Sequence, residues 1–215
     1  RREGGNTVVG ECAVAQLQLR ALPRGVLALV VSGGHTWLLH VAAGARHVDV
    51  VGTTREEATG ECCDKVAGGL GFPCPGGRHI DRNARLGDPH ALKVPQGLTQ
   101  GRAGREHPYD FSFSGVKTAV ARWVEARRDA GEDVPVDDVC APPADSVPSV
   151  LSRQAFDACR QYGLRTPILG RGFSPTSPPA DRLASDRAAP GTAVPIHPLA
   201  SQQSTPVPAA CTEPS

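Results

Sequence analysis

Apolar residues in the first quarter of the chain gather in short runs that are typical of β-strands. The run Val26–Val31 is apolar throughout, as expected of a buried strand, and Thr36–Val41 forms a second strand-like run. Because only the short segment Ser-Gly-Gly-His at 32–35 separates the two runs, the pattern predicts a β-hairpin. A third short strand is predicted over His47–Val51.

Three helices are predicted beyond these strands. The first begins at Thr53-Thr54, where a threonine cap precedes acidic residues, and it ends near Leu70. The second covers Arg78–Leu86, before the next cluster of glycine and proline. The third covers Val116–Asp129, where apolar residues recur on one helical face.

The pattern changes near Ala141, after which most of the chain's 20 prolines occur. A weak helical pattern remains over Leu151–Tyr162, but prolines after Pro167 recur too often for continuous helices or central strands. Residues Gly170–Ser215 are therefore predicted to be largely irregular. The expected organisation is a region with little pattern over residues 1–25, a well-patterned region over residues 26–140, and a proline-rich region over residues 141–215.

The composition, 40% hydrophobic and 21% charged, is that of a globular protein, and its net charge of +1 neither favours nor excludes a nucleic-acid partner. No apolar run approaches the roughly 20 residues of a membrane span, and no secretory signal is visible. The chain has 7 cysteines without a CxxC pair, which predicts reduced thiols, a cytoplasmic location and no zinc site. It has no methionine, so we expect the true N-terminus to be missing.

Four motifs carry candidate chemistry, and each also has an ordinary structural explanation. The strand end Val30–Gly34 exposes backbone N–H groups that can hold phosphate oxygens, unless it is only a hairpin turn. Asp64 shares a helix face with Glu61, where a carboxylate can bind a ribose or a metal-bound water, or simply face solvent.

Gly77, in a Pro-Gly-Gly sequence, permits close approach of a ligand but also suits a plain loop. The segment Asp110–Lys117 alternates polar residues, which can face a cleft, with two phenylalanines as anchors; the alternative is an amphipathic strand end.

Taken in order, the segments VVSGGHT, EEATGECCDKVAGGLGFPCPGG, GDP and DFSFSGVKTAV resemble the tRNA N6-adenosine threonylcarbamoyltransferase family in its bacterial form. This family is also called the glycoprotease or O-sialoglycoprotein endopeptidase family. The resemblance is dense over about Val26–Cys140. It implies an α/β fold of the actin, sugar kinase and Hsp70 type (ASKHA), with two lobes and a nucleotide cleft, of which the C-terminal part is expected to be eroded here.

The resemblance also implies a reaction. A threonylcarbamoyl group moves from threonylcarbamoyl-adenylate to N6 of adenosine 37 in tRNAs that read ANN codons. The implied partners are the tRNA, a paralogous protein and a small ATPase. Catalytic residues stay unassigned. The residues implied in substrate binding are Val30, Val31, Ser32, Gly33 and Gly34 around the adenylate and its phosphate, Asp64 at the ribose, and Gly77 beside it.

The chain departs from the family at its metal site. The family's His-x-x-x-His motif falls on Thr7 and Glu11, neither of which is histidine, and the late Cys-Thr-Asp-Asn-Gly motif is not found. The adenine-binding segment falls on Gly170–Thr176, where Arg171 and Thr176 replace glycine and asparagine.

The Fe²⁺ or Zn²⁺ implied by the family is therefore expected not to bind. Turnover is expected to fail, and the chain is expected to be a degenerate or incomplete copy of the enzyme. Residues 1–25 then represent a remnant of the metal-motif region. The alternative function is a non-catalytic module that binds a nucleotide or a partner.

Overall fold

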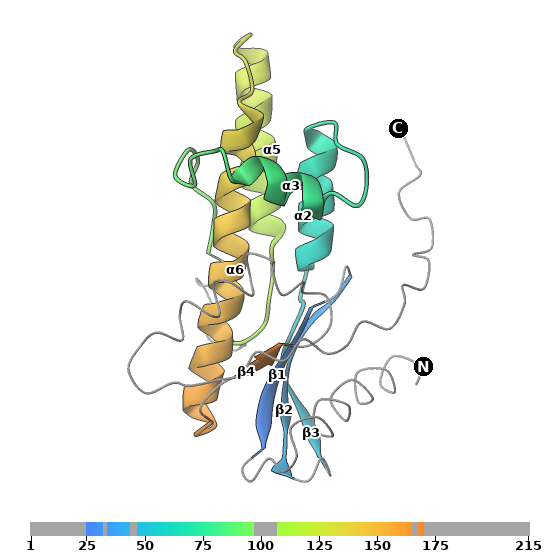
Figure 1. Ribbon diagram of the computed structural model, residues 1–215, viewed down its shortest axis with the longest axis vertical. Coiled ribbons are helices and arrows are strands. Elements are labelled where there is room, and N and C mark those ends of the chain that lie inside the picture. The colour runs from blue at the N-terminus through green and yellow to red at the C-terminus, as the bar shows by residue number, and fades with distance from the viewer. Residues whose placement is uncertain (1–24, 32–33, 44–46, 97–106, 165–166, 170–215) are drawn as a thin grey trace.

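The computed structural model describes residues 25–31, 34–43, 47–96, 107–164 and 167–169, and this part of the chain combines one β-sheet with four α-helices (Figure 1). The elements, in chain order, are β1 (Val26–Val31), β2 (Thr36–Val41), β3 (Val48–Thr53), α2 (Thr59–Gly69), α3 (Gly77–Ala84), α5 (Ser114–Asp129), α6 (Val136–Gln161) and β4 (Pro167–Leu169).

The sheet has the strand order β3-β2-β1-β4. β1 and β2 pair antiparallel, with Val31 opposite Thr36, which confirms the predicted hairpin. β3 pairs antiparallel with β2 and confirms the third predicted strand, although it begins and ends slightly later than expected. β4 lies parallel to β1 on the other side, so the three helices α2, α3 and α5, together with α6, form the connection between β3 and β4.

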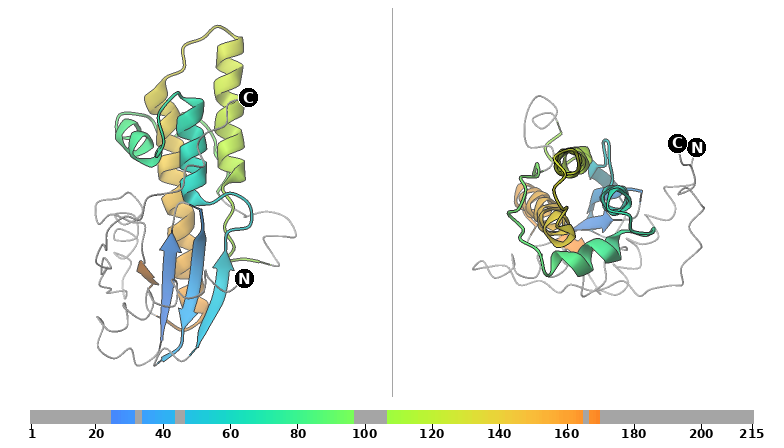
Figure 2. Two further views of the ribbon diagram at one scale, coloured as in Figure 1. Left: turned by 90° about the vertical axis from the view of Figure 1, so that its right-hand side faces the viewer. Right: turned by 90° about the horizontal axis from the view of Figure 1, so that it is seen from above.

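Two apolar clusters cover the two faces of β1. Leu27, Leu29 and Val31 belong to the larger cluster, which also contains the buried residues of the helices. The intervening residues of β1 belong to a smaller cluster on the opposite face. Because both faces are buried, β1 reads as an uninterrupted apolar run. α6 packs against β1, and Figure 2 shows it running along one face of the sheet.

The helices α2, α3 and α5 gather beyond the end of the sheet at which β1 runs into the hairpin turn, whereas α6 spans both the sheet and this helical layer (Figure 1). α2 packs against α5, and α3 packs against α6. The predicted second and third helices are confirmed as α3 and α5, with ends shifted by one or two residues. This arrangement places the beginnings of α2 and α5 close to the hairpin.

The predicted start of the first helix at Thr53-Thr54 is wrong, since α2 begins at Thr59. Thr53 is the last residue of β3, and Thr54 forms a parallel bridge with Phe111. The backbone N–H of Arg55 donates to Phe111 O at 2.8 Å, which keeps this segment extended. A distant segment therefore takes the backbone groups that a helical turn would have used. The predicted helix end near Leu70 is confirmed.

The predicted helix over Leu151–Tyr162 is much too short, because α6 covers Val136–Gln161 and runs through Pro142, Pro143 and Pro148. Each proline removes one backbone donor and disfavours a helix interior by about 3 kcal/mol relative to alanine. All three rings are buried, as is most of the helix face around Leu151, so apolar burial along the long helix outweighs this penalty.

The compositional change at Ala141 thus lies inside a continuous helix. The assignment of residues 141–215 to a separate, eroded lobe stays a prediction, because most of that region, including Gly170–Ser215, lies outside the described residues. Among the helices that the structure describes, none has the length and apolar character needed to cross a membrane.

Candidate functional site

The predicted phosphate turn lies at the end of the hairpin that faces the helices. Val30 and Val31, the last residues of β1, are buried in the smaller and the larger apolar cluster, respectively. Their side chains are therefore core residues, and a ligand at this turn would meet backbone groups. Ser32 and Gly33 lie outside the described residues, and Gly34 is exposed.

Gly34 lies beside the first turn of α2. A methyl group added at Gly34 would be 4.0 Å from Glu61 Oε1. Asp64 follows Glu61 by three residues and so lies on the same helical face, one turn further from the sheet. The structure thereby aligns the hairpin turn with the two carboxylates that the sequence singled out.

Asp64 in turn reaches the Pro-Gly-Gly segment. Its Oδ1 accepts a hydrogen bond from the backbone N–H of Gly76 at 2.6 Å, and α3 begins at the next residue, Gly77. Gly76 is buried against α2, whereas Gly77 is partly exposed and, apart from its chain neighbours and its own helix, no described atom lies within 4 Å of where its side chain would begin. Gly34 therefore lies beside Glu61, and the turn at Gly76, which precedes Gly77, lies beside Asp64 one helical turn further along α2, which the sequence alone did not establish.

The hairpin is tied to the lead-in segment Thr54–Ala58, which precedes α2. The backbone N–H of Thr36 donates to Thr54 Oγ1 at 2.8 Å, and the N–H of Thr54 donates to Thr36 O at 3.0 Å. The hydroxyls of Thr36 and Thr59 lie 3.3 Å apart. Three threonines thus hold the hairpin turn against the start of α2.

The segment Asp110–Lys117 packs on the same lead-in segment. Phe111 and Phe113 are fully buried, as the prediction that they act as anchors requires. Asp110 forms an ion pair with Arg55 and accepts the N–H of Thr53 at 2.9 Å. This segment is therefore fixed to the end of β3 by both its aromatic and its acidic side chains.

The hydroxyls of this segment bind a protein carboxylate. Ser112 Oγ donates to Glu56 Oε2 at 3.1 Å, and Ser114 donates to the same oxygen. The hydrogen bonds from Ser114 and Ser112 hold the pKa of Glu56 below its ordinary value. Because Ser114 is the first residue of α5, its hydrogen bond places the Glu56 carboxylate beside the N-terminus of that helix, where a negative charge is favourable with respect to the helix dipole.

Glu57 is a buried carboxylate that joins α2 to α5. It pairs with Lys65 of α2 and, at 2.7 Å, with Lys117 of α5. Burial raises the pKa of Glu57, but the hydrogen bonds from Lys117 and Lys65 outweigh it, so the pKa lies below its ordinary value. The ion pair between Glu57 and Lys65 was not predicted from the sequence. Glu57 precedes α2 and Lys65 lies within it, so their spacing of eight residues does not match the spacing of neighbours on one helix.

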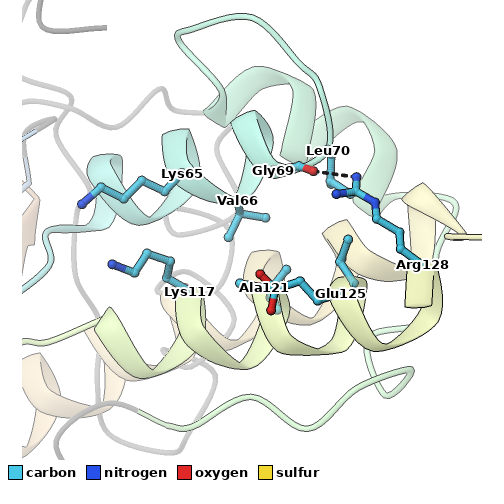
Figure 3. Close-up of a pocket in the computed structure, with 10 residues that line it drawn as sticks. Lys65, Val66, Gly69, Leu70, Lys117, Ala121, Glu125 and Arg128 are labelled. Atoms are coloured by element: carbon cyan, nitrogen blue, oxygen red, sulfur yellow. Dashed lines mark hydrogen bonds between the residues drawn. The ribbon is translucent and has the colours of Figure 1, made fainter. Parts of the chain in front are cut away.

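A hollow of about 100 Å³ lies between α2 and α5 (Figure 3). Aliphatic side chains form its floor. Lys65 and Lys117 extend side by side toward one end of the hollow, and near its other end Arg128 donates a hydrogen bond to Gly69 O at 2.9 Å. This hollow lies on a different face of α2 from Asp64, and its two lysines are already paired with Glu57. It therefore belongs to helix packing rather than to the site that the motifs indicate. The residues that line it are Lys65, Val66, Gly69, Leu70, Lys117, Val120, Ala121, Val124, Glu125 and Arg128.

Buried thiols offer no nucleophile. Burial raises the pKa of Cys62 to about 12, that of Cys140 to about 11 and that of Cys159 to about 12. Because the thiolate is the reactive form, these cysteines are inert near neutral pH. All three are free, in agreement with the predicted reduced thiols.

Several predicted positions lie outside the described residues. They are Thr7 and Glu11 at the family's histidine positions, and Arg171 and Thr176 in the adenine-binding segment. Within the described ranges, no three histidine, cysteine, aspartate or glutamate side chains are grouped so that they could hold a metal ion.

Comparisons with known proteins agree with the motifs. The family model for tRNA N6-adenosine threonylcarbamoyltransferase matches residues 6–203, so the match extends on both sides of Val26–Cys140. Proteins of this name from Bifidobacterium adolescentis and Bifidobacterium longum are each 64% identical to the chain over 174 residues, which cover 81% of this chain and 50% of the relative. A protein of the same name from Corynebacterium diphtheriae is 43% identical over 175 residues, with the same coverage of 81% and 50%. The chain spans about half the length of the curated relatives it matches.

Proposed function

The chain belongs to the tRNA N6-adenosine threonylcarbamoyltransferase family, and we propose that it carries the adenylate-binding part of an enzyme for threonylcarbamoyl transfer. The group would pass from threonylcarbamoyl-adenylate to N6 of adenosine 37 in tRNAs that read ANN codons. The partners proposed with it are the tRNA, a paralogous protein and a small ATPase, all in the cytoplasm. The family has the α/β fold of the actin, sugar kinase and Hsp70 type, and the erosion of its C-terminal part in this chain belongs to the proposal.

The placement of Gly34 beside Glu61 and of the Gly76-Gly77 turn beside Asp64, one helical turn apart on α2, is the observation that carries this proposal. Gly34 and Gly77 lack side chains, so a nucleotide can approach the backbone on both sides of the carboxylate. Asp64 has a second oxygen, Oδ2, that can accept a hydrogen bond from a ribose hydroxyl. In this arrangement, the residues of the chain bind and orient the adenylate.

The metal implied by the family does not fit the residues that this chain supplies. A threonine hydroxyl at Thr7 and a single carboxylate at Glu11 do not reproduce the two imidazole donors of the family motif. The described residues hold no substitute group of three potential ligands. No step proposed for this chain depends on a metal.

The replacement of both histidines is the one observation behind a second candidate function, which is nucleotide binding without turnover. A metal at such a site would act as a Lewis acid on the carbamoyl and phosphate oxygens. The two candidates share the binding site and differ in product formation. A single assay therefore distinguishes them.

We expect product formation on the order of a hundredfold slower than that of the full-length Bifidobacterium longum relative, because the donors for the Lewis acid are replaced. The assay supplies threonylcarbamoyl-adenylate, tRNA, Fe²⁺ or Zn²⁺ and the two partner proteins, and modified adenosine is measured by mass spectrometry of digested tRNA. AMP binding is measured in parallel by calorimetry.

Each result has a separate consequence. Product at the rate of the relative would contradict the metal argument. Saturable AMP binding without any product would establish the second candidate instead of transfer. An absence of both would overturn the proposed function.

A further inference from the structure

Asp64 connects two helices through a main-chain hydrogen bond. It lies in the middle of α2, and its Oδ1 accepts the N–H of Gly76 at 2.6 Å, twelve residues further along the chain. Gly76 immediately precedes the first residue of α3. A hydrogen bond to a carboxylate is stronger than one between neutral groups, so this contact fixes the place at which α3 begins.

The carbonyl of Gly76 continues this connection into α3. Gly76 O accepts the N–H of His79 at 2.9 Å and that of Ile80 at 3.0 Å, which are the first hydrogen bonds of the helix. Ile80 is 1% exposed and belongs to the larger apolar cluster. The first turn of α3 is thus held by hydrogen bonds to Gly76 O and by the burial of Ile80 in the apolar core.

α2 packs so closely against Gly76 that there is no room for a side chain at this position. A methyl group on Gly76 would lie 2.3 Å from Ala67 Cβ, 2.9 Å from Cys63 O and 3.1 Å from Asp64 Cα. Gly77, in contrast, has open space on the side where its own methyl group would point. The turn therefore has one face packed against α2 and one face open to a ligand.

We propose that Asp64 is a positioning residue: by holding Gly76, it sets where Gly77 and the first turn of α3 stand beside the bound adenylate. This role rests on the proposed function, and it is distinct from a contact between Asp64 and the ligand. In this proposal, Oδ1 of the carboxylate accepts the N–H of Gly76, and Oδ2 accepts a hydrogen bond from the nucleotide.

Two substitutions of Asp64 separate these roles. Asp64→Asn keeps an Oδ1 that can accept the N–H of Gly76, but it removes the charge and replaces Oδ2 by an amide donor. Asp64→Ala removes the acceptor altogether. Because alanine is a better helix former than aspartate, α2 itself is not weakened by this change.

The experiment measures two properties of the full chain. Hydrogen exchange at the amides of Gly76 and Gly77 reports the connection without any ligand, and calorimetry with AMP reports binding. We expect Asp64→Ala to accelerate exchange at Gly76 and to weaken AMP binding by about tenfold or more, the equivalent of one lost charged hydrogen bond. We expect Asp64→Asn to retain slow exchange at Gly76 and to bind AMP more weakly than the unaltered chain, because it loses the ribose acceptor Oδ2, but more tightly than Asp64→Ala, because it keeps the turn in place.

The outcomes that would overturn the inference are distinct from failure of the proposed function. If Asp64→Asn loses AMP binding as fully as Asp64→Ala while its Gly76 amide stays protected, Asp64 acts on the ligand through its charge and not through the turn. If Asp64→Ala leaves exchange at Gly76 unchanged, the turn does not depend on this residue. If the unaltered chain itself binds no AMP, it is the proposed function that fails, whatever the exchange shows.

Discussion

Gly76→Ala is expected to lower the free energy of unfolding by about 2–4 kcal/mol, as overpacking against a rigid neighbour does. The added methyl group would lie 2.3 Å from Ala67 Cβ and 2.9 Å from Cys63 O. Neither atom belongs to a flexible side chain, so α2 and the turn would have to separate. The dihedral angle is not the cause, because Gly76 has a φ of −75°, which alanine adopts freely. Urea unfolding of the full chain followed by circular dichroism measures the loss.

Gly77→Ala is the matched control. Apart from its chain neighbours and its own helix, no described atom lies within 4 Å of its added methyl group, and alanine is a better helix former than glycine by up to about 1 kcal/mol. We therefore expect unchanged or slightly higher stability. If the adenylate approaches the open side of Gly77, the same methyl group should weaken AMP binding by about tenfold. Equal destabilisation by both substitutions would contradict the assignment of a packed face and an open face to this turn.

The strands could be predicted because their pattern is local. An apolar run, a short glycine-containing break and a second apolar run determine the β1–β2 hairpin without reference to the rest of the chain. The start of α2 could not be predicted, because Phe111 takes the backbone groups that follow Thr53. The length of α6 was underestimated for a related reason. The sequence shows the helix penalty of the three prolines, but it does not show that their rings are buried in the apolar core.

The candidate site was predictable only in part. Asp64 and the glycines stand out through their motifs, but nothing in their spacing indicates that Asp64 binds the turn before Gly77. The ion pairs of Glu57 were not predicted at all, because Lys117 lies sixty residues away and is brought near by the packing of α5 on α2. Contacts between distant segments follow from the fold, and the sequence pattern reports each segment separately.

Glu57→Gln is expected to lower the free energy of unfolding by about 2 kcal/mol at neutral pH. The Glu57 side chain is 5% exposed, and its replacement leaves two ammonium groups beside each other without a negative charge. The side chains of Lys65 and Lys117 are 55% and 35% exposed, so water compensates part of the loss, which keeps it below that of a fully buried pair. The exposed Glu125 of α5 provides the control, since Glu125→Gln should change stability by less than about 0.5 kcal/mol.

The pH dependence of this difference tests its electrostatic origin. The pKa of Glu57 is lower in the folded chain than the ordinary value of 4.5, so the unfolded chain binds the proton more readily. The stabilisation from Glu57 is therefore complete above about pH 4.5 and is lost as the pH falls through the folded pKa. The pKa of Glu56 is lowered too, but Glu56 is present in both proteins and cancels in the comparison. Urea unfolding of both chains between pH 7 and pH 3 should show a constant difference that closes only in the acidic range. A difference that persists unchanged to pH 3 would mean that Glu57 stabilises the junction of α2 and α5 by its shape rather than by its charge.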